Sequence, residues 1–141
     1  MAKKLKLRAV DEEDLKVISA CLQDAIVALV DMQWQKETNR FVMVASRFCW
    51  EGCPEEGTQE RVHAGISFDG VRGVRHRGID RSQRDRLLAL LAVRPVAGAI
   101  HLDFAGGATI RLEADGILCH LQDLDEPWAT PWRPSHPLDD A

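Results

Sequence analysis

Apolar and polar residues alternate along several short stretches of the chain, as they do in strands that bury one face. Residues 5–9 show this alternation first, and the pattern recurs up to Leu124. The strands predicted from it cover residues 5–9, 30–34, 41–45, 62–68, 71–78, 100–104, 110–113 and 117–124. The turns Lys36–Asn39 and Ala105–Gly107 predict two hairpins, and Asp69-Gly70 predicts a third, whereas Asp115-Gly116 marks another tight turn. The pattern therefore favours a mostly antiparallel sheet.

Two stretches have the spacing of amphipathic helices instead. In the first, Asp11 is a suitable N-cap and Asp14 resembles the acidic residue of a capping box. An apolar stripe follows at helical spacing and should end near Val27: Leu15, Ile18, Cys21, Leu22, Ala25 and Ile26. In the second, Asp80 is the predicted N-cap, and the apolar face consists of Leu87, Leu88, Leu90 and Leu91. Pro95 and Gly98 end this second predicted helix.

The order of elements repeats after 69 positions. Leu5–Asp11 is echoed by Val74–Asp80, and Phe41, Met43 and Ala45 are echoed by Ile110, Leu112 and Ala114. The predicted fold class is α+β, with two pseudo-repeated β-α-β-β-β halves and a mostly antiparallel sheet covered by two helices. An ancient duplication and convergence on one pattern both explain the repeat.

The predicted domain organisation is a single α+β domain over residues 1–124, with halves 1–68 and 71–124. Residues 125–141 form a tail with four prolines and with Trp128 and Trp132. This tail is too apolar for a free solvated end, so we expect it to pack over the sheet or across a subunit boundary. A disordered end is the alternative.

Composition narrows the class of protein further. The chain has 141 residues, of which 45% are apolar and 28% are charged, as in soluble globular proteins. No apolar run approaches the ~20 residues that span a bilayer, and no apolar segment follows the basic start as in a signal peptide. We therefore expect a cytoplasmic protein, with no membrane association and with its four cysteines reduced.

The net charge of −4 hides an uneven distribution. Residues 61–94 hold eight arginines and three aspartates, so this segment carries +5 and the remainder carries −9. The arginines Arg72, Arg75, Arg77 and Arg81, with Arg84 and Arg86, are a candidate surface for nucleic acid, phosphate groups or an acidic partner. Pairing with the acidic remainder of the chain is the alternative. Nucleic acid is the less favoured partner because the chain is acidic and no aromatic residue interleaves the arginines.

Other candidate chemistry is weaker. Cys49 and Cys53, with His63, lack the spacing of a structural zinc site. His101 and Asp103 share one face of a predicted strand, where they either orient a general base or simply face solvent. The glycines of Ala105–Gly107 suit a tight turn rather than a phosphate-binding loop. No catalytic set, metal site or cofactor is predicted.

Four segments together resemble a known family: Arg47–Glu51, Arg77–Asp80, Phe104–Gly107 running into Ile110–Glu113, and Trp128–His136. The family is an uncharacterised bacterial one, a domain of unknown function found mainly in alphaproteobacteria. The resemblance extends from Leu5 to His136. It implies a bacterial cytoplasmic protein, but it implies no activity and no functional residues.

The function predicted first is that of a non-enzymatic protein-interaction or self-assembling module, such as a homodimer, in which Trp128 and Trp132 contact the partner. The alternative is binding of nucleic acid or an anionic ligand through the arginine-rich segment 72–86. An enzyme that uses His101 and Asp103 ranks third.

Overall fold

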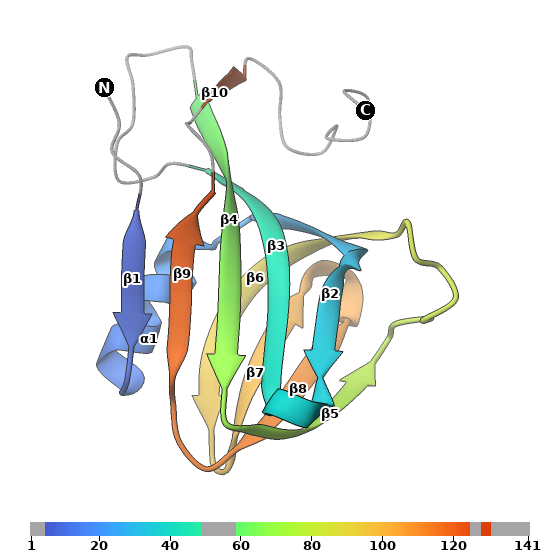
Figure 1. Cartoon of the computed structure of the whole chain (residues 1–141). Helices are drawn as coiled ribbons and strands as arrows, with labels where there is room; N and C mark the ends of the chain where they lie inside the picture. Colours follow the sequence, from blue (N-terminus) through green and yellow to red (C-terminus); the bar gives the residue numbers. More distant parts are fainter. Residues whose placement is uncertain (1–4, 49–58, 125–127, 131–141) are drawn as a thin grey trace.

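The computed structural model describes residues 5–48, 59–124 and 128–130, with residues 59–60 and 128–130 described through their backbone. One α-helix, α1 (Glu12–Cys21), and ten strands lie within these ranges (Figure 1). The strands are β1 (Lys6–Ala9), β2 (Ile26–Gln35), β3 (Arg40–Phe48), β4 (Gln59–Asp69), β5 (Val71–Arg77), β6 (Leu87–Val96), β7 (Ala99–Phe104), β8 (Thr109–Ala114), β9 (Cys119–Asp123) and β10 (Trp128–Thr130). The α+β class is confirmed, with strand far outweighing helix.

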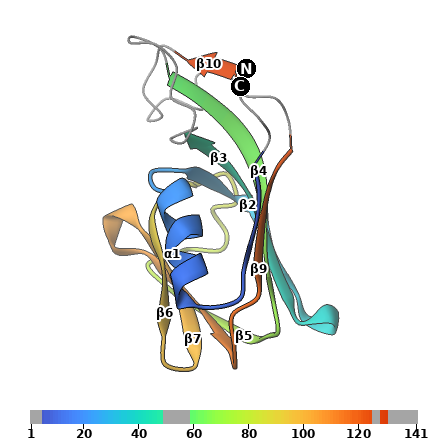
Figure 2. The ribbon, with the colours of Figure 1, turned by 90° about the vertical axis from the view of Figure 1, so that its left-hand side faces the viewer.

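All strand pairs are antiparallel, and nine strands follow the order β1-β9-β4-β3-β2-β6-β7-β8-β5. We refer to β1-β9-β4-β3-β2 as the first half-sheet and to β6-β7-β8-β5 as the second. They are joined through a short ladder between Ile26–Ala28 of β2 and Leu87–Ala89 of β6. The sheet curls at this junction, so the two half-sheets face each other (Figures 1 and 2). Apolar side chains from both halves fill the space between them.

The core draws on alternate positions of facing strands, because successive side chains of a strand point to opposite faces. On β3, Phe41, Met43 and Ala45 are buried. The second half-sheet supplies buried residues from β6, β7 and β8: Leu88, Leu90, Ile100, Leu102, Ile110 and Leu112. One continuous cluster includes both sets, so the two halves stabilise each other.

Helix α1 begins as the capping pattern predicts. The Asp11 carboxylate accepts a hydrogen bond from the Asp14 backbone N–H at 2.8 Å, and the Asp14 carboxylate accepts one from the Val10 N–H at 3.1 Å. The helix buries Leu15 and Ile18 and lies between β1 and β6 (Figure 2). It ends at Cys21 rather than near Val27, because the chain turns at Asp24, whose φ is +66°, and enters β2.

The second predicted helix is wrong, because Leu87–Val96 is strand β6. Leu88 and Leu90 point into the core, whereas Leu91 is 47% exposed, which is strand rather than helix behaviour. The expected N-cap Asp80 instead accepts hydrogen bonds from the N–H and hydroxyl of Ser82, two residues on, as in an Asx turn. Pairing with β2 and β7 on either side outweighs the helical propensity of a leucine-rich segment. The second half therefore lacks the β-α-β-β-β order on which the pseudo-repeat rested.

Two of the three predicted hairpins are confirmed. β2 and β3 join through a 3₁₀ turn at Lys36–Thr38, and β7 and β8 join through Ala105–Gly107, where Gly106 and Gly107 have φ of +83° and +84°. The hairpin at Asp69-Gly70 is wrong, because β4 pairs with β3 and β9 whereas β5 pairs with β8. This turn carries the chain from the first half-sheet to the second.

A buried ion pair joins β3 to β9 in the first half-sheet. Arg47 Nε and Nη2 donate to the two carboxylate oxygens of Asp123 at 2.9 and 2.8 Å. Both side chains are almost fully buried, and Asp123 also accepts from the Leu5 N–H at 2.7 Å. The bidentate geometry and the extra donor compensate for removing the two charges from water.

Part of the predicted tail forms a strand. The backbone of β10 pairs with the start of β4, with Trp128 opposite Arg61 and Thr130 opposite Gln59. The rest of the tail, including Trp132, lies outside the described residues. Within the described ranges, no helix has the length and apolar character that crossing a membrane requires.

Candidate functional site

The outward face of the second half-sheet carries most of its charged side chains. Along β8, buried Ile110, Leu112 and Ala114 alternate with half-exposed Thr109, Arg111 and Glu113. The same alternation on β7 turns His101 and Asp103 outward. β5 adds exposed arginines at one edge of this face. Its chemistry is therefore that of a charged surface on a rigid sheet.

Four cationic or imidazole side chains lie in one row across this face. In register, Arg94 of β6 is opposite His101 of β7, His101 is opposite Arg111 of β8, and Arg111 is opposite Arg75 of β5. We call Arg94, His101, Arg111 and Arg75 the basic row. Directly opposite positions bring side chains close, and like charges placed there destabilise a sheet. The stability of the fold alone therefore does not explain why these four side chains lie in one row.

His101 stands between two guanidinium groups. Its Nδ1 lies 3.2 Å from Arg94 Nη2, and its Nε2 lies 3.0 Å from Arg111 Nη1. A neutral imidazole has one acceptor nitrogen and one N–H, whereas a guanidinium only donates. Whichever tautomer is present, one arginine faces an N–H instead of an acceptor. Burial, followed by the charges of Arg94 and Arg111, lowers the pKa of His101.

Two carboxylates offset part of this positive charge. Asp103 accepts a hydrogen bond from Arg94 Nε. Glu113 is shared, with one of its oxygens 3.4 Å from Arg75 Nε and 3.7 Å from Arg111 Nε. Arg77 forms no ion pair with any described residue. Four guanidinium groups against two carboxylates leave two positive charges on this face.

A shallow hollow lies at the β5 side of the row. Its volume is about 170 Å³, and its lining consists of Arg75, His76, Arg77, His101, Thr109 and Arg111. Arginines, imidazoles and one hydroxyl supply donors, and no carboxylate is part of the lining. We call it the outer hollow. Its donor set suits an oxyanion.

The structure divides the predicted arginine surface into separate places. Arg75 and Arg77 line the outer hollow. Arg72 forms an exposed ion pair with Asp115 at 2.9 Å, which is the self-pairing alternative. Arg81 lines a different cavity, between β2 and β5. Arg86 Nη1 donates to the Gly78 carbonyl at 2.8 Å and braces the loop between β5 and β6.

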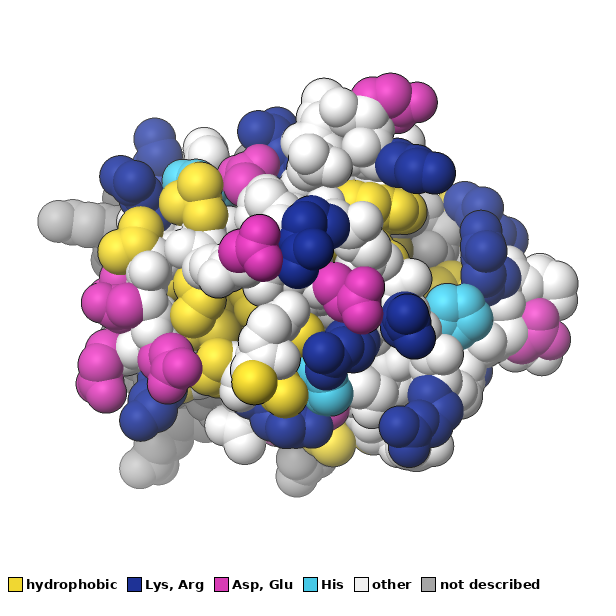
Figure 3. Space-filling view, turned by 90° about the horizontal axis from the view of Figure 1, so that it is seen from below, with side chains coloured by type: hydrophobic (Ala, Val, Ile, Leu, Met, Phe, Trp, Pro, Cys, Tyr) yellow, Lys and Arg dark blue, Asp and Glu magenta, His cyan; other side chains and the backbone are white. Residues whose placement is uncertain are grey.

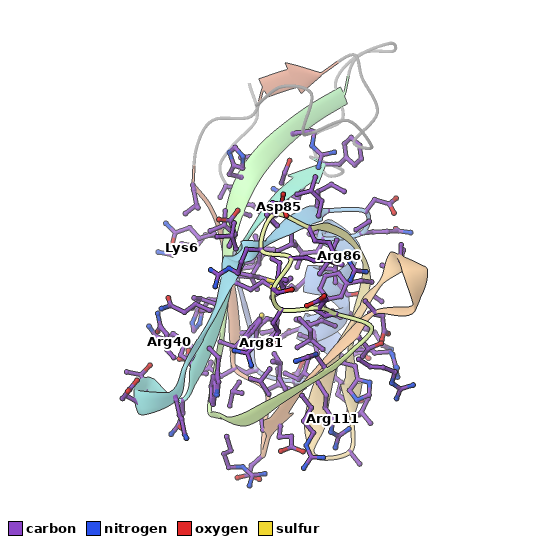
Figure 4. The ribbon with its side chains drawn as sticks, turned by 90° about the vertical axis from the view of Figure 1, so that its right-hand side faces the viewer. Lys6, Arg40, Arg81, Asp85, Arg86 and Arg111 are labelled. Carbon is purple, nitrogen blue, oxygen red and sulfur yellow. The ribbon has the colours of Figure 1, made fainter. Side chains whose placement is uncertain are left out.

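The cavity that Arg81 lines has a volume of about 220 Å³. Its lining comes from β2, β3, β5, β8 and the β5–β6 loop: Leu29, Met32, Gln33, Trp34, Phe41, Val74, His76, Ile79, Arg81, Arg84 and Ile110. We call it the side cavity. His76 lines it and the outer hollow as well, so the two are neighbours. Figure 4 shows Arg81 on the loop that crosses this side of the molecule and Arg111 on the second half-sheet.

His101 and Asp103 share the outward face of β7 but do not contact each other as a dyad would. No hydrogen bond joins these two described side chains; instead, Arg94 contacts both. An imidazole held between arginines, with a lowered pKa, is a weak base for proton abstraction.

The remaining candidates from the sequence are the cysteines and the possible metal ligands. Cys49 and Cys53 lie outside the described residues. Cys119 is buried, and burial raises the pKa of its thiol to about 12, so this cysteine is inert. In the described ranges, no group of three or more His, Cys, Asp or Glu side chains is placed to hold a metal ion.

The backbone of Trp128 lies away from the arginines of the second half-sheet. β10, which contains Trp128, lies at the end of the molecule opposite the start of β5 (Figure 1). Neither the Trp128 side chain nor Trp132 is described, so the interaction surface assigned to them stays a prediction.

Sequence reasoning missed Arg94, Thr109 and Arg111 as members of one site. Alternation along residues 100–104 and 110–113 was a signal that His101, Asp103 and Arg111 face outward. No signal in the sequence could have placed β5 beside β8, which begins more than thirty residues later.

Comparison with known proteins gives a family but no activity. No curated protein and no solved structure matches the chain. The model of one family, described as "Protein of unknown function (DUF2948)", matches residues 5–136. Since this match covers nearly the whole chain, the protein belongs to this family of unknown function.

Proposed function

We propose that this protein binds a small ligand bearing a doubly charged oxyanion, such as a phosphate or sulfate group, in the outer hollow. The observation that supports this most is the position of His101 between Arg94 and Arg111. The imidazole has one acceptor for these two donors; Arg94 also donates to Asp103, and an oxyanion in the outer hollow supplies acceptors to Arg111.

The charge balance supports a dianion. The face keeps two positive charges after Asp103 and Glu113 are counted. Arg77 is exposed and unpaired among the described residues, and Thr109 adds a hydroxyl donor to the lining. These groups come from paired strands, so their positions are set before the ligand arrives, which reduces the entropic cost of binding.

A small ligand suits this face better than a nucleic acid does. The chain as a whole has a net charge of −4, which opposes the approach of a polyanion. The outer hollow has no aromatic side chain on which a base could stack. The three arginines of the row already share charge with carboxylates of the same face.

Calorimetric titration of the full chain with sodium sulfate at constant ionic strength tests the proposal. Sulfate is a suitable probe because it stays doubly charged across neutral pH. Arg111→Gln should weaken sulfate binding about tenfold, the effect of losing one charge-assisted hydrogen bond. Arg72→Gln is the matched control, since it removes one exposed charge from β5 of the same half-sheet, outside the outer hollow.

Three results would overturn the proposal: no sulfate binding, equal weakening by both variants, or preference for a polyanion. For the last, a single-stranded oligonucleotide is titrated in parallel. Tighter binding of the oligonucleotide, with steep salt dependence that Arg111→Gln removes, would assign the surface to nucleic acid instead.

A further inference from the structure

We infer that the side cavity is a second binding site, for a small aromatic acid whose ring enters the cavity and whose anionic group meets Arg81 and Arg84. This site differs from the outer hollow in its lining and in the ligand it takes. The inference does not depend on the proposed oxyanion site.

The side cavity exists because β2 parts from the second half-sheet. β2 pairs with β6 over three residues only, Ile26–Ala28. Beyond these residues, β2 is hydrogen-bonded to the loop between β5 and β6. The Leu29 N–H donates to the Arg86 carbonyl and the Val30 N–H donates to the Arg84 carbonyl, each at 2.9 Å. Past Val30, β2 keeps β3 as its strand partner within the described part of the chain. Met32 and Trp34 are consequently only half-buried.

The interior of the side cavity is apolar. Seven of its lining side chains are hydrophobic: Leu29, Met32, Trp34, Phe41, Val74, Ile79 and Ile110. Figure 3 shows the opening as a hollow with hydrophobic side chains inside and Lys or Arg and His side chains at its edge. A ring that enters there removes apolar surface of the protein and of the ligand from water.

The volume sets the size of the apolar group. An engineered apolar cavity of about 150 Å³ holds one benzene, and sites for drug-sized ligands begin near 300 Å³. At about 220 Å³ the side cavity has room for one ring with a short substituent. Trp34 and Phe41 in the lining offer aromatic surfaces against which such a ring packs.

The charged side chains at the opening of the side cavity determine which polar group the ligand carries. Arg81 and Arg84 are exposed, and neither guanidinium forms an ion pair or hydrogen bond within the described part of the chain. His76 adds a third nitrogen-bearing side chain, and no Asp or Glu lines the cavity. An apolar interior with such a rim is complementary to a ring that carries a carboxylate.

Phenylacetate is the probe. Benzyl alcohol is the control that has the ring without the charge, and acetate is the control that has the charge without the ring. Binding to the full chain is followed through the methyl signal of Met32, one of three methionines. Met43 lies directly opposite Met32 on β3 but is 1% exposed and does not line the cavity, so its signal should shift less. Phenylacetate should shift the Met32 signal saturably, with a Kd of about 1 mM or below, as expected for a ligand of this size. Benzyl alcohol and acetate should each bind at least about tenfold more weakly, because each lacks half of the interactions.

Two double variants distinguish the effect of the arginines at the opening of the side cavity from a general loss of positive charge. Arg81→Gln/Arg84→Gln should weaken phenylacetate about tenfold and leave benzyl alcohol unchanged. Arg8→Gln/Arg72→Gln removes the same charge from exposed positions outside both sites and should leave phenylacetate within about twofold. The inference is overturned if phenylacetate leaves Met32 unshifted or if both double variants weaken it equally. Sulfate binding, measured separately by calorimetry, does not enter this result, so the two proposals fail independently.

Discussion

The imidazole of His101 and the guanidinium of Arg111 lie directly opposite each other on β7 and β8, with Nε2 3.0 Å from Nη1. Arg94 holds the same relationship to the other ring nitrogen. A sheet position that sets two permanent donors against one acceptor costs stability unless a third group contributes acceptors. For Arg94 that group is Asp103, whose Oδ1 accepts from Nη2 at 3.4 Å; for Arg111, which lines the outer hollow, it is the proposed oxyanion.

Removing one charge from the row should therefore stabilise the free protein. Arg111→Gln relieves the cross-strand contact with Arg75, and we expect the free energy of unfolding to rise by up to about 1 kcal/mol at low salt. Urea unfolding at low and high salt measures it, and the gain should shrink as salt screens the charges. A clear loss of stability in the variant would mean that Arg111 is structural.

The pKa of His101 predicts how stability responds to acid. Because the folded-state pKa lies below the unfolded one, the unfolded chain takes up this proton first as the pH falls. The contribution of His101 to stability is complete above the unfolded pKa and declines as the pH falls from there toward the folded pKa. Between about pH 7.5 and 5.5 the wild type should lose more stability than His101→Gln. Parallel loss in both proteins would show that His101 titrates normally.

The buried Arg47–Asp123 pair should be far more sensitive than an exposed one. Asp123→Asn leaves the buried Arg47 charge without its bidentate partner, and we expect a loss of about 3 kcal/mol or more in unfolding free energy. Asp115→Asn, which breaks the exposed pair with Arg72, should cost below about 0.5 kcal/mol. Similar losses in chemical denaturation of the two variants would contradict the buried position of Asp123.

Adjacent leucines on β6 distinguish the observed strand from the predicted helix. Leu90 is fully buried, so Leu90→Ala should cost about 2–5 kcal/mol. Leu91 is 47% exposed, so Leu91→Ala should cost well under half of that. A helix with both leucines on its apolar face would make the two losses similar, and thermal unfolding of both variants decides between them.

Local patterns in the sequence predicted those parts of the fold that depend on local interactions. The cap at Asp11, the β2–β3 hairpin and the Ala105–Gly107 turn all rest on residues close in sequence. The leucine-rich segment at 87–91 fits a helix or a strand equally well, and its partners β2 and β7 decided the outcome. Distant pairing is a tertiary effect that periodicity does not contain.

The candidate sites divide in the same way. The arginine-rich segment predicted one surface for an anion or an acidic partner, whereas Arg75 and Arg77 line the outer hollow and Arg72 and Arg81 lie elsewhere. The basic row depends on the register of four strands, and the side cavity depends on where β2 leaves β6. Neither the strand register nor the point where β2 separates from β6 can be predicted from residues that are close in sequence.

The most direct test of the oxyanion site is an NMR pH titration of the His101 ring, in chloride and in sulfate at equal ionic strength. In chloride, the pKa of His101 should lie below that of an exposed histidine. A dianion beside the row favours the charged imidazole, so sulfate should raise this pKa, and sulfate affinity should increase as the pH falls. The same His101 pKa in both salts, with no saturable change in its ring signals, would contradict oxyanion binding in the outer hollow.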